Sequence, residues 1–196
     1  PWAVHAVAHV MEMQGRHDEG RAWLEAQRGN WAEDGNGLAG HNGWHLALFH
    51  LESLDIEAAL ACHDAWLATE GIQDITLQRL DASALLWRLH LLGADVGSRW
   101  DAVADAWQAD EAASGYYAFN DVHAVLALIG AGRMPAAVDR VARVVAAVPR
   151  LDAGRQAMAR EVGLPLMQGL LAFGQGRHDD AVAELYPVRE VAQRFG

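Results

Sequence analysis

The sequence predicts an all-α fold, an α-solenoid of about five antiparallel helical hairpins. The composition is the first indication, because 52% of the 196 residues are hydrophobic, Ala and Leu dominate, and only five prolines occur. Runs in which Val, Ile or Thr alternate with polar residues, as half-buried strands require, are missing. The second indication is a turn that recurs at a nearly fixed interval, and the third is an amphipathic segment after each turn.

The recurring turns have the sequences QGRHDEG, SLDIEAA, LGADVGS, AGRMPAA and QGRHDDA. Their second residues, which we call the turn anchors, are Gly15, Leu54, Gly93, Gly132 and Gly176, at intervals of 39, 39, 39 and 44 residues. The residues five positions after the anchors are all small: Gly20, Ala59, Ser98, Ala137 and Ala181. Seven positions before the anchors lie Ala8, Ala47, Leu86, Val125 and Gly169. Small side chains let two helices approach closely, so the repeat predicts one hairpin around each turn.

Each predicted unit consists of a helix A, the turn and a helix B. The units lie near residues 1–30, 41–70, 80–110, 120–149 and 160–195. Helix B is amphipathic, as in RWDAVADAW and AAVDRVARVVAAV, whose apolar residues recur at three- and four-residue spacing. Longer connections, such as Arg28–Gly40 and Ala109–Asn120, join the units. We therefore expect a single domain over residues 1–196, in which neighbouring units share a core.

The chain is strongly acidic, with a formal net charge of −11 from 26 acidic and 15 basic residues. All the basic residues are Arg, and such a surface repels phosphate backbones and anionic lipids, which excludes nucleic acid and membranes as expected partners. Cys62 is the only cysteine, so an internal disulfide is impossible, and we expect a cytoplasmic protein. Because the chain begins at Pro1 directly with a helix-like segment, we expect a piece of a longer protein. The sequence leaves the oligomeric state open.

Several segments resemble a known family. The last unit, GLLAFGQGRHDDAVAEL, is similar to a tetratricopeptide repeat, with Gly169, Gly176 and Ala181 at the small and turn positions. PWAVHAVAHVMEMQGR, HNGWHLALFHLE, DASALLWRLHLLG and FNDVHAVLALIGAG resemble the tetratricopeptide repeat protein 38 family, over nearly the whole chain. The resemblance implies a right-handed superhelix in which every helix A lines a concave groove. It also implies that the chain corresponds to the C-terminal part of longer proteins, and it implies no specific activity.

Counting back from each turn, the resemblance places polar and aromatic residues on the groove face of helix A. We call this set the groove stripe: Trp2, His5, His9, Glu12, His41, Trp44, His45, Glu52, Asp81, Trp87, Arg88, His90, Asp121 and His123. His5 and His9, like His41 and His45, are four residues apart, so each pair lies on one side of its helix. We expect the partner of His45 to be His9. His50 points away from His41 and is expected to be structural.

The groove stripe supports three hypotheses. In the first, its side chains are core groups bonded to carbonyls or carboxylates, and Asp81 and Arg88 form an ion pair that holds neighbouring units in register. In the second, which we place first for function, the groove binds a peptide, a protein partner or a small polar ligand.

In the third hypothesis the protein is a metal-dependent enzyme of hydrolase type. His5, His9, His41 and His45 then hold Zn²⁺, Fe²⁺ or Mn²⁺, which activates a water molecule. No convincing nucleophilic triad and no Gly-rich phosphate loop occurs in the sequence. The sequence alone therefore leaves open whether the protein is an enzyme and which residues would be catalytic.

Overall fold

The computed structural model describes residues 1–33, 38–69, 71 and 74–195. Every regular element within these residues is helical, and none of them forms a strand. The all-α prediction is therefore confirmed. The chain divides into two compact units, Pro1–Arg99 and Trp100–Gly196, which are described separately. A single solenoid domain over residues 1–196 stays a prediction.

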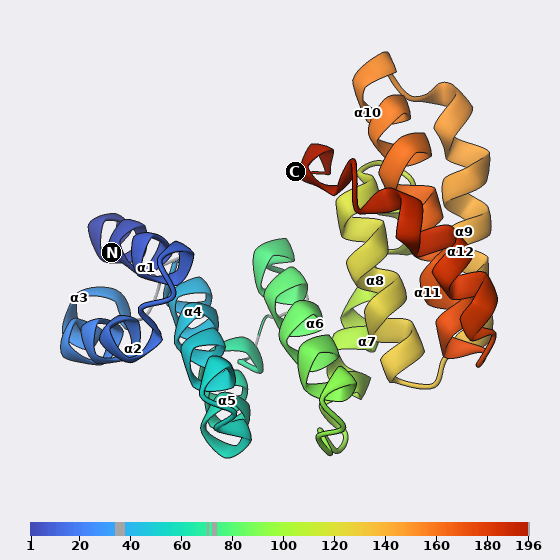
Figure 1. Ribbon diagram of the computed structural model, residues 1–196. Helices are drawn as coiled ribbons and strands as arrows, with labels where there is room; N and C mark the ends of the chain where they lie inside the picture. Colours follow the sequence, from blue (N-terminus) through green and yellow to red (C-terminus); the bar gives the residue numbers. More distant parts are fainter. Residues whose placement is uncertain (34–37, 70, 72–73, 196) are drawn as a thin grey trace. The chain divides into compact units, whose positions relative to one another are not determined.

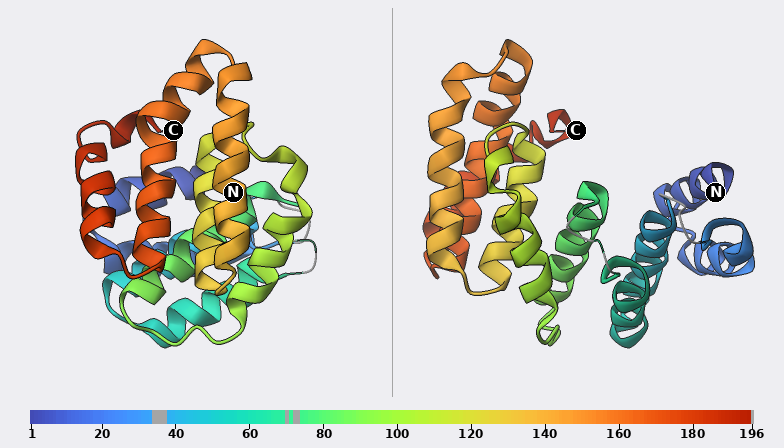
Figure 2. Two further views of the ribbon diagram at one scale, coloured as in Figure 1. Left: turned by 90° about the vertical axis from the view of Figure 1, so that its right-hand side faces the viewer. Right: turned by 180° about the vertical axis from the view of Figure 1, so that it is seen from behind.

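The first unit is drawn in blue to green in Figures 1 and 2. Its helices are α1 (Trp2–Met13), α2 (His17–Ala26), α3 (Arg28–Trp31), α4 (Ala39–Glu52), α5 (Ile56–Cys62) and α6 (Thr76–Leu91). A π-helical turn, η1 (His63–Leu67), continues α5. The helix α1 packs on α2, and α4 packs on α2, on α5 with η1, and on α6. The helix α4 is therefore the central element of this unit.

All five turn anchors have a left-handed backbone. Their φ angles are 69° at Gly15, 56° at Leu54, 77° at Gly93, 71° at Gly132 and 74° at Gly176. At each turn the anchor's N–H donates to the carbonyl three residues back, and the next N–H donates five residues back. This is the bonding of a Schellman helix end, which glycine favours because it has no Cβ. Leu54 is the one described non-glycine residue with a left-handed φ.

The small residues let the helices of the first unit approach closely. A Cβ on Gly20 in α2 would lie 2.3 Å from the ring of Phe49 in α4, and one on Gly43 would lie 2.3 Å from Trp66. Close approach removes large side chains from water, and Phe49 is only 1% exposed. The rings of Trp31 and Trp66 pack beside each other, with centroids 4.9 Å apart.

The predicted repeat fails at one position in the third hairpin. Helix B begins two residues after the anchor in the other four hairpins, but α7 (Arg99–Ala109) begins six residues after Gly93. Gly97 adds a second left-handed residue, with a φ of 57°, and its N–H donates to the Asp95 carboxylate. The expectation that Ser98 lies where the two helices of this hairpin approach closely is therefore wrong, because Ser98 is exposed in the longer connection.

The second unit begins inside α7 and is drawn in yellow-green to red in Figure 1. Its further helices are α8 (Ala118–Gly130), α9 (Met134–Ala147), α10 (Ala153–Met158), α11 (Leu164–Gly174) and α12 (His178–Val188). Short turns are η2 (Glu111–Ala113), η3 (Val148–Arg150), η4 (Ala159–Gly163) and η5 (Ala192–Arg194). The helix α11 packs on α8, α9 and α12. Part of the core consists of Ala104, Leu128 and Ala137.

The connections between hairpins are less open than predicted. The helix α3 lies inside the expected connection Arg28–Gly40, while residues 34–37 of that connection lie outside the described residues. In the connection Ala109–Asn120, η2 is followed by α8, which already begins at Ala118.

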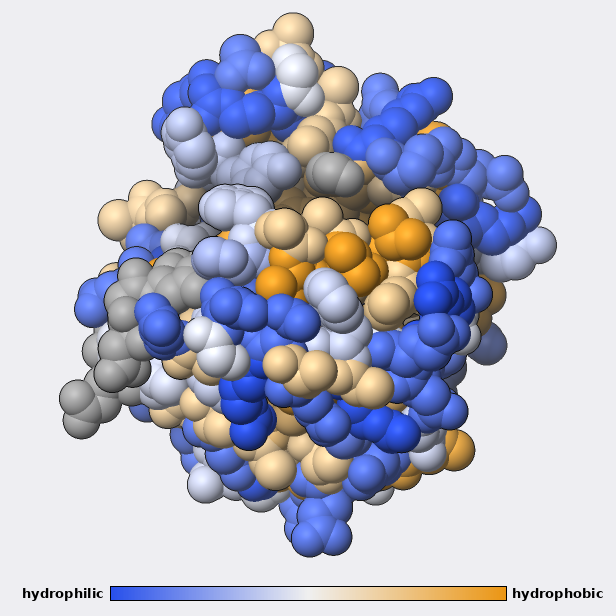
Figure 3. All heavy atoms as spheres, turned by 90° about the vertical axis from the view of Figure 1, so that its left-hand side faces the viewer, coloured by the Kyte–Doolittle hydropathy of each residue, from blue (hydrophilic) through white to orange (hydrophobic). Residues whose placement is uncertain are grey.

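Among the described residues no helix combines the length and the apolar character needed to cross a membrane. Hydrophilic residues dominate the face shown in Figure 3, and a smaller hydrophobic area interrupts them.

Candidate metal site

The structure brings together four histidines from two helices of the first unit. His5 and His9 lie on α1, and His41 and His45 lie on the first turns of α4, which Figures 1 and 2 show beside α1. One ring nitrogen from each histidine lies within 4.8 Å of the nitrogens from the other three. The rings of His9 and His45 are 4.5 Å apart between centroids, so His45 meets the expected partner. We call these four residues the histidine cluster.

Two carboxylates hold the α4 histidines from neighbouring helices. The Nδ1 atom of His41 lies 2.7 Å from Oδ2 of Asp81 on α6, and Nδ1 of His45 lies 2.9 Å from Oε2 of Glu12 on α1. An ionised carboxylate only accepts hydrogen bonds, so both Nδ1 atoms carry the proton. In the neutral form of each ring, a proton on Nδ1 leaves the lone pair on Nε2. Carboxylates orient metal-binding histidines in this way in known metal sites.

The remaining nitrogen of His45 has no hydrogen-bond partner among the described residues. Its Nε2 atom is buried, and the residue is only 1% exposed. An unpaired buried acceptor costs free energy, on the order of 1–3 kcal/mol. On the opposite helix the Nε2 atoms of His5 and His9 lie 2.9 Å from each other, so one of these rings donates to the other. The cluster therefore holds several nitrogen lone pairs in a small volume.

Burial keeps the rings on α1 neutral. Desolvation lowers the pKa of His5 to about 4, and the neighbouring rings of His45, His41 and His9 act in the same direction. Desolvation also lowers the pKa of His9, again assisted by His45. Neutral imidazole is the form that binds a metal, and these rings are neutral at pH 7.

The two carboxylates differ in their surroundings. The hydrogen bond from His45 lowers the pKa of Glu12, which therefore stays ionised. Burial raises the pKa of Asp81, although the hydrogen bond from His41 opposes this effect. The Asp81 carboxylate is 5% exposed, and among the described residues no arginine forms an ion pair with it. A positive charge at the histidine cluster would stabilise both carboxylates.

Aromatic side chains form one wall of the cluster. The ring of Trp44 stacks on His41, with centroids 5.3 Å apart and an interplanar angle of 9°. Trp2 contacts His5 edge-on at 6.2 Å, and its side chain is 69% exposed. His9 is exposed, whereas His45 is buried, so the cluster opens to solvent on the side of α1.

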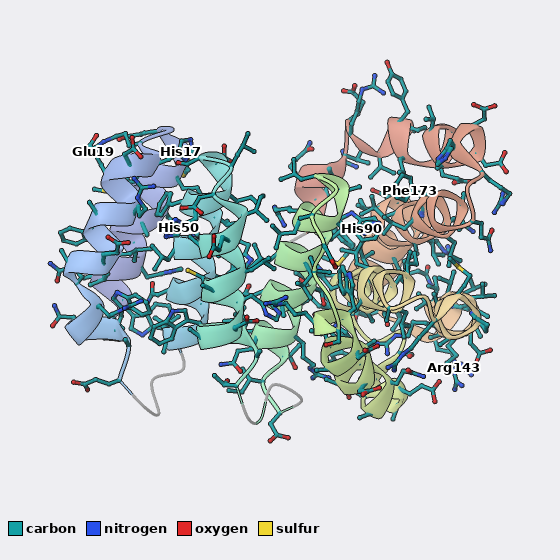
Figure 4. All side chains as sticks on the ribbon, turned by 90° about the horizontal axis from the view of Figure 1, so that it is seen from below. His17, Glu19, His50, His90, Arg143 and Phe173 are labelled. Atoms are coloured by element: carbon teal, nitrogen blue, oxygen red, sulfur yellow. The ribbon has the colours of Figure 1, made fainter. Side chains whose placement is uncertain are left out.

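The other stripe residues of the first unit lie toward the C-terminal ends of α4 and α6. Glu52 lies 3.9 Å from His17, and Arg88 donates to the carbonyl oxygen of Ala84 on its own helix. The expected ion pair between Asp81 and Arg88 is wrong, because Asp81 instead accepts from His41 on α4. His90, marked in Figure 4, is exposed on α6. Its ring lies 5.4 Å from that of Trp87 between centroids.

The fourth-unit residues of the stripe belong to the second compact unit. Asp121 is fully buried and accepts hydrogen bonds from Arg140 and from the N–H of Gly115. Burial raises the pKa of Asp121, while Arg140 opposes this effect. His123 hydrogen-bonds to the carbonyl oxygen of Phe119 through Nδ1. These contacts are local to the second unit, and they fit the interpretation of both residues as structural groups.

Two histidines outside the stripe lie beside a carboxylate, although the buried Nε2 of His63 has no hydrogen-bond partner among the described residues. His50 lies 3.5 Å from the Asp55 carboxylate, and His63 lies 3.1 Å from Asp64. Desolvation lowers the pKa of His63. His17 and His50, marked in Figure 4, belong to α2 and α4 but not to the histidine cluster.

One residue of the site was missed in the sequence. Asn42, on α4, is fully buried next to His41, and its amide counteracts the fall in the pKa of His5. An asparagine inside an otherwise apolar helix was the signal that could have identified it.

No model of a protein family matches the chain, and no solved structure matches it. The chemistry of the site therefore rests on the residues described above.

Proposed function

We propose that the first unit binds one divalent transition-metal ion through His5, His9, His41 and His45. The observation that carries the proposal is the buried Nε2 of His45, which lacks a partner while Glu12 fixes the proton on Nδ1. A metal ion would use this lone pair together with those of the three neighbouring rings.

The donor set favours zinc over manganese. Imidazole nitrogens suit Zn²⁺ and similar ions, whereas Mn²⁺ prefers carboxylate and water ligands. Glu12 and Asp81 hold the rings of His45 and His41 and do not face the ion directly. Their two negative charges balance the charge of a divalent ion.

Metal analysis of protein purified without a polyhistidine tag tests the proposal. We expect about one equivalent of Zn²⁺ after equilibration, and a rise in the free energy of unfolding of about 2.7 kcal/mol at a hundredfold excess over Kd. The double variant His5→Ala, His9→Ala should lose both effects and retain its helical circular dichroism, because these two rings are the more exposed ones on α1.

The matched control is His90→Ala, His178→Ala, which removes two exposed histidines outside the cluster. It should bind the ion as the unchanged protein does. A protein that contains no metal, and whose unfolding midpoint does not respond to zinc salts, would contradict the proposal.

Metal-assisted hydrolysis is a second candidate, and the exposure of His9 favours it. A catalytic zinc keeps one position for water, so in this candidate only three of the four histidines bind the ion, and the exposed His9 is the one that water would replace. Hydrolysis of 4-nitrophenyl acetate provides the test. The zinc-loaded protein should hydrolyse the ester faster than the metal-free protein does. Equal hydrolysis rates would rule out this candidate.

We further propose that the helix pairs are repeats of an α-solenoid of tetratricopeptide type, related to the tetratricopeptide repeat protein 38 family. The shared left-handed turn at all five anchors supports this assignment. Binding of a peptide, a protein partner or a small polar ligand along the groove stripe remains a hypothesis. We place it behind metal binding, because the histidine rings of the first unit contact one another.

A further inference from the structure

A separate cavity lies at the C-terminal ends of α4 and α6. Its volume is about 400 Å³, which is in the range of small-molecule sites. It is lined by Leu51, Glu52, Leu54, Arg88, Leu91 and Leu92. Leu54, Leu91 and Leu92 are 68%, 57% and 53% exposed, so large apolar side chains face solvent here. The lining therefore combines an apolar surface with two opposite charges.

Arg88 forms no ion pair within the described residues, unlike three of the other arginines of the first unit. Arg16, Arg21 and Arg99 each pair with a carboxylate, whereas no carboxylate of the described residues lies within ion-pair distance of Arg88. Its guanidinium donates a hydrogen bond to the carbonyl oxygen of Ala84, 2.9 Å away. A guanidinium has five N–H donors, so most of them remain available to a ligand.

The guanidinium of Arg88 is both accessible to solvent and partly desolvated, as is typical of a side chain that binds a charged ligand. The side chain is accessible to solvent, yet the protein around it lowers its pKa by desolvation, which the charges of Glu12 and Glu52 partly oppose. Glu52 itself lies 3.9 Å from His17 and forms no ion pair with Arg88 among the described contacts. Two opposite charges thus line one cavity without pairing with each other.

The cavity and the histidine cluster share one surface of the first unit. Glu52 follows His45 on α4 by seven residues, and Arg88 follows Asp81 on α6 by seven. Residues seven apart lie on the same helix face, two turns or about 10 Å along the axis. Glu12 connects the two regions, since it binds His45 and its charge also acts on Arg88.

We propose that this cavity binds an α-amino acid with an apolar side chain. Its carboxylate pairs with Arg88, its ammonium group pairs with Glu52, and its side chain packs on the leucines. A plain carboxylic acid would leave Glu52 with His17 alone, and a plain amine would leave Arg88 without a carboxylate. The binding itself does not depend on a metal ion.

Calorimetric titration of the full chain with L-leucine, in the presence of EDTA, tests the proposal. We expect saturable binding of one molecule. 4-Methylpentanoate lacks the ammonium group and 3-methylbutylamine lacks the carboxylate, and each should bind at least about tenfold more weakly, because each loses one charge-assisted hydrogen-bonding group. This ligand series uses the unchanged protein, so it does not depend on whether a variant folds.

Variants test the two charged residues. Arg88→Gln and Glu52→Gln should each weaken leucine binding at least about tenfold. Arg16→Gln, which removes an exposed arginine elsewhere in the unit, should leave it unchanged.

Three results would overturn the assignment: no leucine binding up to about 10 mM, equal binding by Arg88→Gln, or 4-methylpentanoate binding as tightly as leucine. Because EDTA is present throughout, these results are independent of the metal test. Absence of metal in that test would refute the metal site and leave the amino-acid site standing.

Discussion

Replacing Glu12 by Gln isolates the role of the carboxylate behind the metal site. Glu12 contacts the histidine cluster through Nδ1 of His45, at 2.9 Å. Glutamine has nearly the same shape and can still accept this hydrogen bond, but it carries no charge. The substitution therefore removes the electrostatic support of His45 while the ring keeps its position.

The magnitude follows from the kind of bond and its exposure. A hydrogen bond to a charged group contributes about 1.5–3 kcal/mol. The Glu12 side chain is 34% exposed, so solvent screens its charge and the lower end of this range applies. We expect zinc affinity to fall about tenfold, or about 1.4 kcal/mol, at the lower end of the 10- to 100-fold losses typical of residues that support metal ligands. Without metal, the free energy of unfolding should change by less than about 1 kcal/mol.

Competition with a chromophoric zinc chelator at pH 7 measures the affinity, and urea unfolding in EDTA measures the stability. Glu19→Gln is the control, because it removes the charge of an exposed glutamate that pairs with Arg16. An unchanged zinc affinity in Glu12→Gln would refute the reasoning. So would a loss of metal-free stability as large as the loss of binding, because Glu12 would then be a purely structural partner of His45.

Three further predictions concern stability. The pKa of His5 is about 4 in the folded chain, below its ordinary 6.5, so the unfolded chain takes up the proton first as the pH falls. The free energy of unfolding in EDTA should therefore be highest above pH 6.5 and decline toward pH 4. The decline should be less steep in His5→Asn, and the same decline in this variant as in the unchanged protein would refute the reasoning. In urea unfolding, Leu54→Gly should stabilise the chain and Gly93→Ala should destabilise it, each by about 0.5–1 kcal/mol. A left-handed backbone costs a residue with a Cβ about 1–2 kcal/mol, and the greater freedom of glycine in the unfolded chain offsets part of this cost. Opposite signs would contradict the turn assignment. Gly20→Ala should lower the free energy of unfolding by about 1–3 kcal/mol, since its Cβ would lie 2.3 Å from Phe49, and a stable variant would show that this contact relaxes easily.

The period of the sequence predicted the turns and the pairing of histidines between helices. A glycine at a fixed interval marks a left-handed helix end, and the same interval identifies which helices A are neighbours. The pairing of His9 with His45 follows from that register, and the structure confirms the contact. The register also predicted Leu54 as an anchor, although leucine rarely adopts this backbone.

Periodicity could not predict distances between helices or the bonding of individual atoms. The spacing placed Asp81 and Arg88 near each other, but seven residues along one helix separate them by about 10 Å, and Asp81 instead reaches His41 on α4. Nor could it predict the start of α7, because the anchor Gly93 keeps its interval while Gly97 adds a second bend. The cavity at Arg88 was missed for the same reason, because it depends on the distance between the C-terminal ends of α4 and α6.

The two units differ in whether a buried carboxylate has a charged partner within the chain. This difference argues for a ligand in the first unit. In the second unit Asp121 is paired with the buried guanidinium of Arg140 and with a backbone N–H, so its charge is compensated within the chain. In the first unit the buried Asp81 accepts a hydrogen bond from the imidazole of His41 and pairs with no arginine, and Nε2 of His45 is left without a partner among the described residues. A folded chain retains such uncompensated groups chiefly where function requires them. A divalent cation among the four histidines would compensate both groups at once, which is why we place metal binding ahead of a purely structural role.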